Sequence, residues 1–308
     1  MDTELFSKIL ALILLYKYKT PQNKVTAVLR EISSSGGISP INRDNINVVL
    51  SNISSALPEI SDNDWDFGQK LYYDNISNEI NIFVITETAY PKYLRVIKDA
   101  PPLLFIKGNL EIFNDLPGVA IVGARDTSKN GVEIAKRLAS YVAKRGWVVV
   151  SGLAIGIDAA AHTGTITSGG KTIAVLASGL DKATPSQNAD LADKILKTGG
   201  AWVSEHSIGV PAKKHHFVPR NRIQIGLSAG SIIVEAAIKS GSLSQARFCV
   251  GQNRPLFAVV PHISSNPYRL NCEGTLHMVE ELGAIPIRSK DDYPKLIEVL
   301  ETEREIII

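Results

Sequence analysis

Glycines, serines and arginines gather in four short clusters of this 308-residue chain, a combination that suits the binding of phosphate groups. The clusters are Gly123 with Arg125, Ser151 with Gly152, Arg220-Asn221-Arg222, and Ser240-Gly241-Ser242. Glycine lets backbone amides approach an anion closely, and a helix that begins after such a turn adds partial positive charge. Arginine and serine side chains donate hydrogen bonds to phosphate oxygens. These residues therefore predict a phosphate-binding site.

The positive charge is concentrated in one part of the chain. Residues 206–272 contain eight Lys and Arg residues and one acidic residue, whereas the whole chain has a formal net charge of +2. Lys213 and Lys214 precede the arginine cluster, and we expect them on the rim of the phosphate site. Such a segment indicates a basic surface for an anionic partner.

Glu235 is the single acid of that basic segment, and two roles are open for it. It could be a structural anchor for Arg220 or Arg222 across the site, or it could be a catalytic carboxylate. We favour the anchor, because the sequence offers few catalytic groups.

The sequence predicts no metal site, no cofactor and no enzymatic activity. His215-His216 lie beside Lys213-Lys214, where positive potential disfavours a metal ion, and no Cys, His and Asp set has zinc or iron spacing. Gly170-Lys171-Thr172 resembles the end of a P-loop, but a strand follows it, whereas a P-loop requires a helix there.

Apolar runs rich in β-branched residues alternate with helical patterns from about residue 103 onward. The predicted strands are Leu103–Ile106, Val119–Val122, Trp147–Val150, Thr172–Ala177, Ala201–Ser204, Ser231–Val234, Leu256–Val260 and Ala284–Ile287. This alternation predicts an α/β fold with a doubly wound, mostly parallel, Rossmann-like sheet. Ligands bind beyond the carboxyl ends of such strands, so we expect Arg125, Arg220 and Arg222 to face the same edge.

The first 85 residues lack the regular alternation of strand and helix patterns seen later in the chain. Phe6–Tyr18 and Lys24–Ile32 have helical patterns, and a polar stretch follows them. We predict a small, mainly helical N-terminal domain at residues 1–85 and the Rossmann-like domain at residues 86–308. Two cysteines and the lack of an apolar run of about 18 residues indicate a cytoplasmic protein without a disulfide framework or membrane span.

An ordered series of motifs resembles the DNA-processing protein A (DprA/Smf) family. The motifs are Pro101-Pro102-Leu103-Leu104-Phe105-Ile106-Lys107-Gly108, Ala120-Ile121-Val122-Gly123-Ala124-Arg125, Ser151-Gly152-Leu153-Ala154, Gly156-Ile157-Asp158, Pro219-Arg220-Asn221-Arg222 and Ser240-Gly241-Ser242-Leu243. The resemblance covers roughly residues 90–285. It implies a non-enzymatic protein that binds single-stranded DNA, helps to load a RecA-type recombinase in DNA recombination and natural transformation, and forms a homodimer.

Two features leave alternatives open. The family usually has arginine where this chain has Ile155, so one expected cation of the site is missing. The alternative function is a DprA-like component of antiphage defence, either a sensor of a nucleotide-derived ligand or an antitoxin that restrains a toxin partner. The apolar residues of Leu276–Leu300 could form the dimer surface, or they could pack the terminal helices on the sheet.

Overall fold

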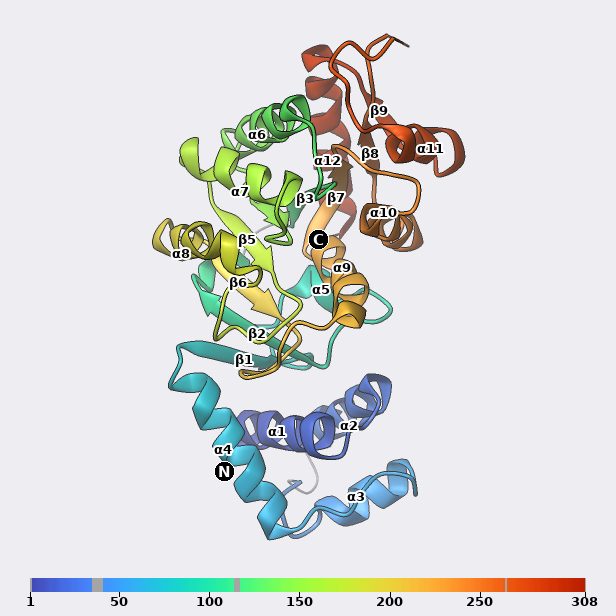
Figure 1. Cartoon of the computed structure of the whole chain (residues 1–308). Coiled ribbons are helices and arrows are strands. Elements are labelled where there is room, and N and C mark those ends of the chain that lie inside the picture. The colour runs from blue at the N-terminus through green and yellow to red at the C-terminus, as the bar shows by residue number, and fades with distance from the viewer. Residues whose placement is uncertain (1, 35–40, 114–116, 264, 308) are drawn as a thin grey trace.

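Nine strands form one sheet in the computed structural model, which describes residues 2–34, 41–113, 117–263 and 265–307 (Figure 1). The strands are β1 (Ile80–Val84), β2 (Leu103–Gly108), β3 (Gly118–Val122), β4 (Val149–Ser151), β5 (Thr172–Val175), β6 (Ala201–Ser204), β7 (Ser228–Ile233), β8 (Leu256–Val259) and β9 (Ile285–Ile287). Their order is β1-β2-β6-β5-β4-β3-β7-β8-β9. The seven strands from β6 to β9 are parallel, whereas β1 and β2 pair antiparallel at one edge.

Helices cover both faces of the parallel strands. Side chains alternate along a strand, so Val119 and Ile121 of β3 belong to one buried cluster and Ala120 and Val122 to another. The first cluster includes residues of α6 (Lys129–Ala143), α7 (Ile157–Thr167) and α12 (Tyr293–Ile307). The second includes residues of α9 (Phe217–Gly226), α10 (Gly241–Gly251) and α11 (Glu273–Glu281). This three-layer arrangement confirms the predicted doubly wound α/β fold.

The N-terminal helices lie at one end of the molecule, beyond β1 (Figure 1). They are α1 (Thr3–Leu12), a π-helical turn (Ile13–Lys17), α2 (Gln22–Ser34), α3 (Ile46–Ile53) and α4 (Asp62–Ile76). Two further short helices of the described residues, α5 (Lys92–Arg95) and α8 (Ala189–Lys197), lie later in the chain. Leu10 and Leu14 belong to the same buried cluster as Leu104 and Phe105 of β2. The helical region therefore shares a core with the edge of the sheet.

Two elements differ from the sequence-based expectation. Residues 80–84 form strand β1, paired with β2, inside the segment that was expected to be mainly helical. Phe217–Gly226 is helix α9, and it contains the Arg220-Asn221-Arg222 cluster, for which the sequence analysis predicted no helix. Of the apolar residues considered for a dimer surface, Met278, Leu296 and Leu300 are buried within the chain, which supports their role in packing the terminal helices on the sheet.

A buried ion pair joins α9 to the segment after β6, and hydrogen bonds from Gln22 connect it to the N-terminal helices. Arg222 donates from Nη1 to Glu205 Oε1 (2.8 Å) and from Nη2 to Glu205 Oε2 (2.7 Å), in a bidentate geometry. Gln22 at the start of α2 donates to Glu205 Oε2 (2.7 Å) and accepts from Arg222 Nη2 (3.1 Å). The Tyr16 hydroxyl donates to the Glu205 carbonyl oxygen (3.1 Å). These contacts position α9 relative to β6 and α2.

The free energy of unfolding should fall at acidic pH because protonation of Glu205 breaks this ion pair. Burial alone would raise the pKa of Glu205, but the hydrogen bonds and charge of Arg222 hold that pKa at about 2. Because the folded pKa lies below the ordinary value of 4.5, the pair stabilises the fold at neutral pH, and this contribution is lost as pH falls from about 4.5 toward 2. We expect Glu205→Gln to lower the free energy of unfolding by about 3 kcal/mol at pH 7.

Urea unfolding of the wild type and of Glu205→Gln between pH 7 and pH 2 measures this effect. The gap between the two proteins should close below about pH 4.5. The exposed Glu280→Gln variant is the control and should follow the wild type. A gap that stays constant with pH would contradict this role of the ion pair.

Candidate functional site

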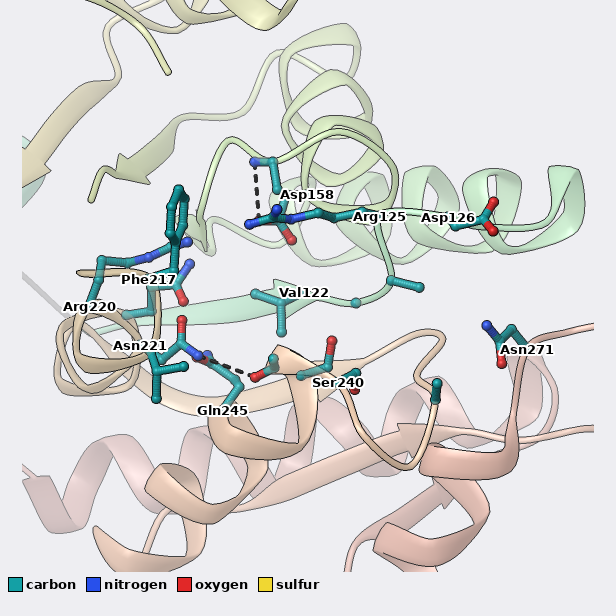
Figure 2. A pocket seen from close by; sticks show the side chains of 18 residues that line it. Val122, Arg125, Asp126, Asp158, Phe217, Arg220, Asn221, Ser240, Gln245 and Asn271 are labelled. Atoms are coloured by element: carbon teal, nitrogen blue, oxygen red, sulfur yellow. Dashed lines mark hydrogen bonds between the residues drawn. The ribbon is translucent and has the colours of Figure 1, made fainter. Parts of the chain in front are cut away.

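A cavity of about 520 Å³ opens at the carboxyl ends of β3 and β7, where the strand order of the sheet reverses (Figure 2). This reversal point is where open α/β sheets bind ligands. The loop after β3, the face of α9 and the N-terminus of α10 form most of its wall. The lining residues include Gly123, Arg125, Asp126, Asp158, Phe217, Arg220, Asn221, Gln224, Ser240, Gly241, Ser242, Gln245 and Asn271.

A smaller cavity of about 160 Å³ continues from the first. The two cavities share Arg125, Ala154 and Phe217, and the smaller one is also lined by Gly152 and Ile155. We call the two cavities together the groove. Ile155, the position at which the family usually has arginine, is 45% exposed there and presents an apolar side chain.

Arg125 is the exposed arginine of the groove. It follows the carboxyl end of β3 and lies where the two cavities join. Its guanidinium stands 5.0 Å from the centre of the Phe217 ring, a cation–π contact that orients it across the groove. This charge is available to an anionic ligand.

Arg220 is buried beneath the groove rather than exposed in it. Its Nη1 donates to the carbonyl oxygen of Val175 (3.0 Å), and its Nε has no hydrogen-bond partner among the described residues. Burial lowers the pKa of Arg220 to about 10, so the side chain stays charged at neutral pH. A Cβ on Gly152 would overlap this guanidinium, which explains why a glycine stands there. Arg220 therefore adds positive electrostatic potential to the groove from its buried position beneath the cavity wall.

Asp158 is the carboxylate whose negative charge opposes the lowering of the Arg220 pKa by burial. It lies at the start of α7 and accepts hydrogen bonds from the backbone N–H groups of Gly152 (3.1 Å) and Ala154 (3.3 Å). Burial raises its pKa, and the positive charge of Arg220 opposes that rise. The carboxylate thus fixes the loop after β4 that forms one wall of the smaller cavity.

Several buried polar atoms on the groove wall have no partner among the described residues. They are Gln224 Nε2, both amide atoms of Gln245, and Ser240 Oγ. Gln224 and Gln245 are each 1% exposed, and Asn221 beside them donates to the Gly241 carbonyl oxygen (3.3 Å). A buried polar group without a hydrogen bond costs about 1–3 kcal/mol, so a ligand that pairs with these groups would recover that loss.

Glu235 is an anchor, but its partners differ from those expected. Its carboxylate accepts from the backbone N–H of Ser128 (2.9 Å), the Ser128 hydroxyl (2.7 Å), the Thr127 hydroxyl and the backbone N–H of Asn271 (2.9 Å). The expectation that it pairs with Arg220 or Arg222 was wrong, because the side chain turns toward the N-terminus of α6. A carboxylate is stabilised there by unpaired N–H groups and the helix dipole.

The predicted site residues separate into three groups. Those that line the groove are Gly123, Arg125, Gly152, Arg220, Asn221, Ser240, Gly241 and Ser242. Ser151 and Arg222 do not line it: Ser151 is buried and donates to the Ile121 carbonyl oxygen (2.7 Å), and Arg222 pairs with Glu205. Lys213 and Lys214 are exposed in the segment before Phe217, outside the cavity lining.

Phe217, Gln224 and Gln245 line the groove but were not among the predicted site residues. Phe217 and Gln224 lie on α9, for which the sequence analysis predicted no helix. Pro219 in the first turn of α9 was a usable signal for a helix start.

Burial also reduces the basic surface. Of the eight cations in residues 206–272, Arg220, Arg222 and Arg254 are buried and the other five are exposed. Within the described residues, no group of three His, Cys, Asp or Glu side chains has a metal-binding arrangement. No helix of the described chain is long and apolar enough to cross a membrane.

Gly152 provides a test of how tightly the groove is packed. We expect Gly152→Ala to lower the free energy of unfolding by about 1–3 kcal/mol, because the added methyl group displaces the buried Arg220 guanidinium. Gly241→Ala is the matched control, since a Cβ there meets nothing within 4 Å, and it should change stability by less than about 0.5 kcal/mol. Thermal unfolding measures both; equal effects would contradict the described packing.

Comparison with known proteins gives consistent results. Residues 81–298 match the family DNA recombination-mediator protein A. DNA processing protein DprA of Bacillus subtilis is 38% identical over 213 residues, which cover 69% of this chain and 70% of the relative. The corresponding protein of Streptococcus pneumoniae is 40% identical over 210 residues, covering 68% and 72%.

Solved structures lead to the same family. The structure of DNA processing protein A from Streptococcus pneumoniae superposes with a TM-score of 0.72 at 33% identity, covering 89% of this chain and 93% of that one. The structure of DNA processing protein A from Helicobacter pylori superposes with a TM-score of 0.62 at 28% identity, covering 71% and 96%. The nine-stranded fold, the groove motifs and these similarities together show that the chain belongs to the DNA recombination-mediator protein A (DprA/Smf) family.

Proposed function

We propose that this protein is a non-enzymatic mediator of DNA recombination that binds single-stranded DNA in the groove. The observation that carries the proposal is an exposed arginine, Arg125, which stands over an aromatic ring at the mouth of a cavity. The wall of this cavity contains buried polar atoms that have no partner among the described residues. Proteins that bind single strands combine cations for the phosphates with aromatic and polar surfaces for the bases. The Helicobacter pylori relative is described as having a distinct single-stranded DNA binding mode, which supports this proposal.

Different residues of the groove contact the phosphates and the bases of the strand. Arg125 pairs with a phosphate, and the N-terminus of α10 at Ser240–Ser242 holds another through backbone N–H groups and the helix dipole. Arg220 adds positive potential from beneath. One base enters the cavity, where the amides of Gln224 and Gln245 provide both donors and acceptors for its edge.

The same observations suit a nucleotide-derived small ligand, which is the second candidate. A cavity of about 520 Å³ with unpartnered amides would also accept a free mononucleotide, as in a defence sensor. We favour the strand, because the smaller cavity extends the groove past Arg125 toward Ile155. An oligothymidylate that binds much more tightly than thymidine monophosphate supports the strand; equal affinity favours the sensor.

Family membership extends the proposal to partners. We propose that the protein delivers the bound strand to a RecA-type recombinase and acts as a homodimer. Light scattering at micromolar concentration tests the second statement, and a monomer there would contradict it. The antitoxin alternative would instead require a stable complex with a toxin partner.

Arg125 provides a first test of strand binding. We expect Arg125→Ala to weaken the binding of an oligothymidylate and to reduce the log–log salt slope by roughly 0.7, the value for one phosphate contact. The exposed side chain contributes little to the fold, so the melting temperature should stay almost unchanged. Fluorescence anisotropy at several salt concentrations measures the effect. Arg288→Ala, which removes an exposed charge after β9, is the control. Full affinity in Arg125→Ala would contradict the proposal.

Gln245 provides a second test, aimed at the base. We expect Gln245→Leu to lower affinity for an oligothymidylate by about tenfold, because the base loses hydrogen bonds to the amide. An abasic oligonucleotide of the same length keeps the phosphates but lacks the base edge, so wild type and variant should bind it equally. An equal loss with both probes would show that Gln245 does not contact a base.

A further inference from the structure

A third cavity, separate from the groove, lies between the N-terminal helices and the sheet region. It has a volume of about 690 Å³ and is lined by α2, by the segment 97–100 and by the C-terminal part of α10. We call it the α2–α10 cleft. None of its lining residues lines the groove.

The rim of the α2–α10 cleft is positively charged. Arg30 on α2, Lys98 after α5 and Arg247 on α10 are all exposed, and none of them forms an ion pair with a described residue. Asp99 is the one acid among the described lining residues, and its carboxylate lies 3.4 Å from the Nε of Arg222. The cleft therefore has free positive charge on three separate chain segments, which suits an anion that reaches all three.

The inner part of the cleft is apolar with one polar contact. Ile85 and Ile97 are buried at its base, and the ring of Phe248 is half-buried in its wall. Gln252 donates from Nε2 to the carbonyl oxygen of Arg222 (3.4 Å), while its Oε1 is buried without a partner among the described residues. An apolar base, an aromatic ring and a free acceptor suit a planar heterocycle with N–H groups, and the cationic rim suits its phosphate.

Helix α10 connects this cleft to the groove. Its first residues line the groove, and Arg247, Phe248 and Gly251 on the same helix line the cleft. From Ser240 to Gln252 the helix axis spans about 18 Å, a distance that a few extended nucleotides can cover. A strand leaving the groove along α10 would therefore reach the cleft.

We propose that the α2–α10 cleft binds a nucleotide unit, with its phosphate on Arg30, Lys98 and Arg247 and its base against Phe248. This inference rests on the proposed function, because the favoured source is the same single strand that occupies the groove. A free nucleotide has the same chemistry and is the other source. The cleft adds a second anchoring point, so affinity rises when an oligonucleotide is long enough to occupy both sites.

Strand length separates the two sites experimentally. Anisotropy titrations use oligothymidylates of about 4 and about 20 nucleotides with the wild type and with Arg30→Ala/Arg247→Ala. We expect the double variant to bind the long strand roughly tenfold more weakly at low salt, with a salt slope shallower by about 1.4, and to bind the short strand normally. Lys144→Ala/Arg288→Ala removes two exposed charges elsewhere and is the matched control.

The remaining outcomes show whether the cleft binds the single strand or a free nucleotide, and which of the two proposed sites is wrong. Calorimetric titration with thymidine monophosphate measures the affinity of both proteins for a free nucleotide. If the double variant loses affinity for thymidine monophosphate but keeps its affinity for the long strand, the cleft binds a free nucleotide rather than the strand. Unchanged binding of both the long strand and the nucleotide overturns the cleft proposal. Short-strand binding that survives Arg125→Ala overturns the groove proposal instead, whatever the double variant does.

Discussion

The buried pair between Arg222 and Glu205 is the contact on which the arrangement of the groove depends. Glu205 follows β6, Arg222 lies on α9, and Gln22 on α2 completes the network. An unpaired charge in such a position would cost several kcal/mol, so each partner restricts where the others can lie. Because α9 also presents Phe217 and Gln224 to the groove, an ion pair outside the groove determines the geometry inside it.

The three arginines that the sequence grouped together have three different environments. Arg125 is exposed and available to a ligand. Arg220 is buried beneath the groove and forms no salt bridge with a described residue, and Arg222 is neutralised by Glu205. Only the first can exchange its solvent contacts for a phosphate without disrupting the fold. A count of cations in the sequence therefore overstates the charge that a nucleic acid would meet, although the buried Arg220 still raises the potential of the groove.

Unsatisfied polar groups mark both of the cavities for which we propose ligands. Among the residues that the structure describes, the amides of Gln224 and Gln245 lack partners in the groove, and Gln252 Oε1 lacks one in the α2–α10 cleft. Most buried polar atoms in folded proteins are paired, and a ligand could supply the partners that these groups lack. Since α10 contributes residues to both cavities, one rigid helix sets the spacing between the two proposed sites.

The amino-acid sequence by itself determined the parallel strands, the loops at their carboxyl ends and the family, because continuous apolar runs and ordered motifs are local signals. Only the tertiary structure decided which side chains face the groove. Arg220 and Arg222 lie two positions apart, which on a helix of 3.6 residues per turn separates them by about 200°. One therefore lies beneath the groove and the other points toward Glu205. Likewise, Glu235 meets Ser128 rather than an arginine, because the partner of a carboxylate depends on which distant helix begins beside it.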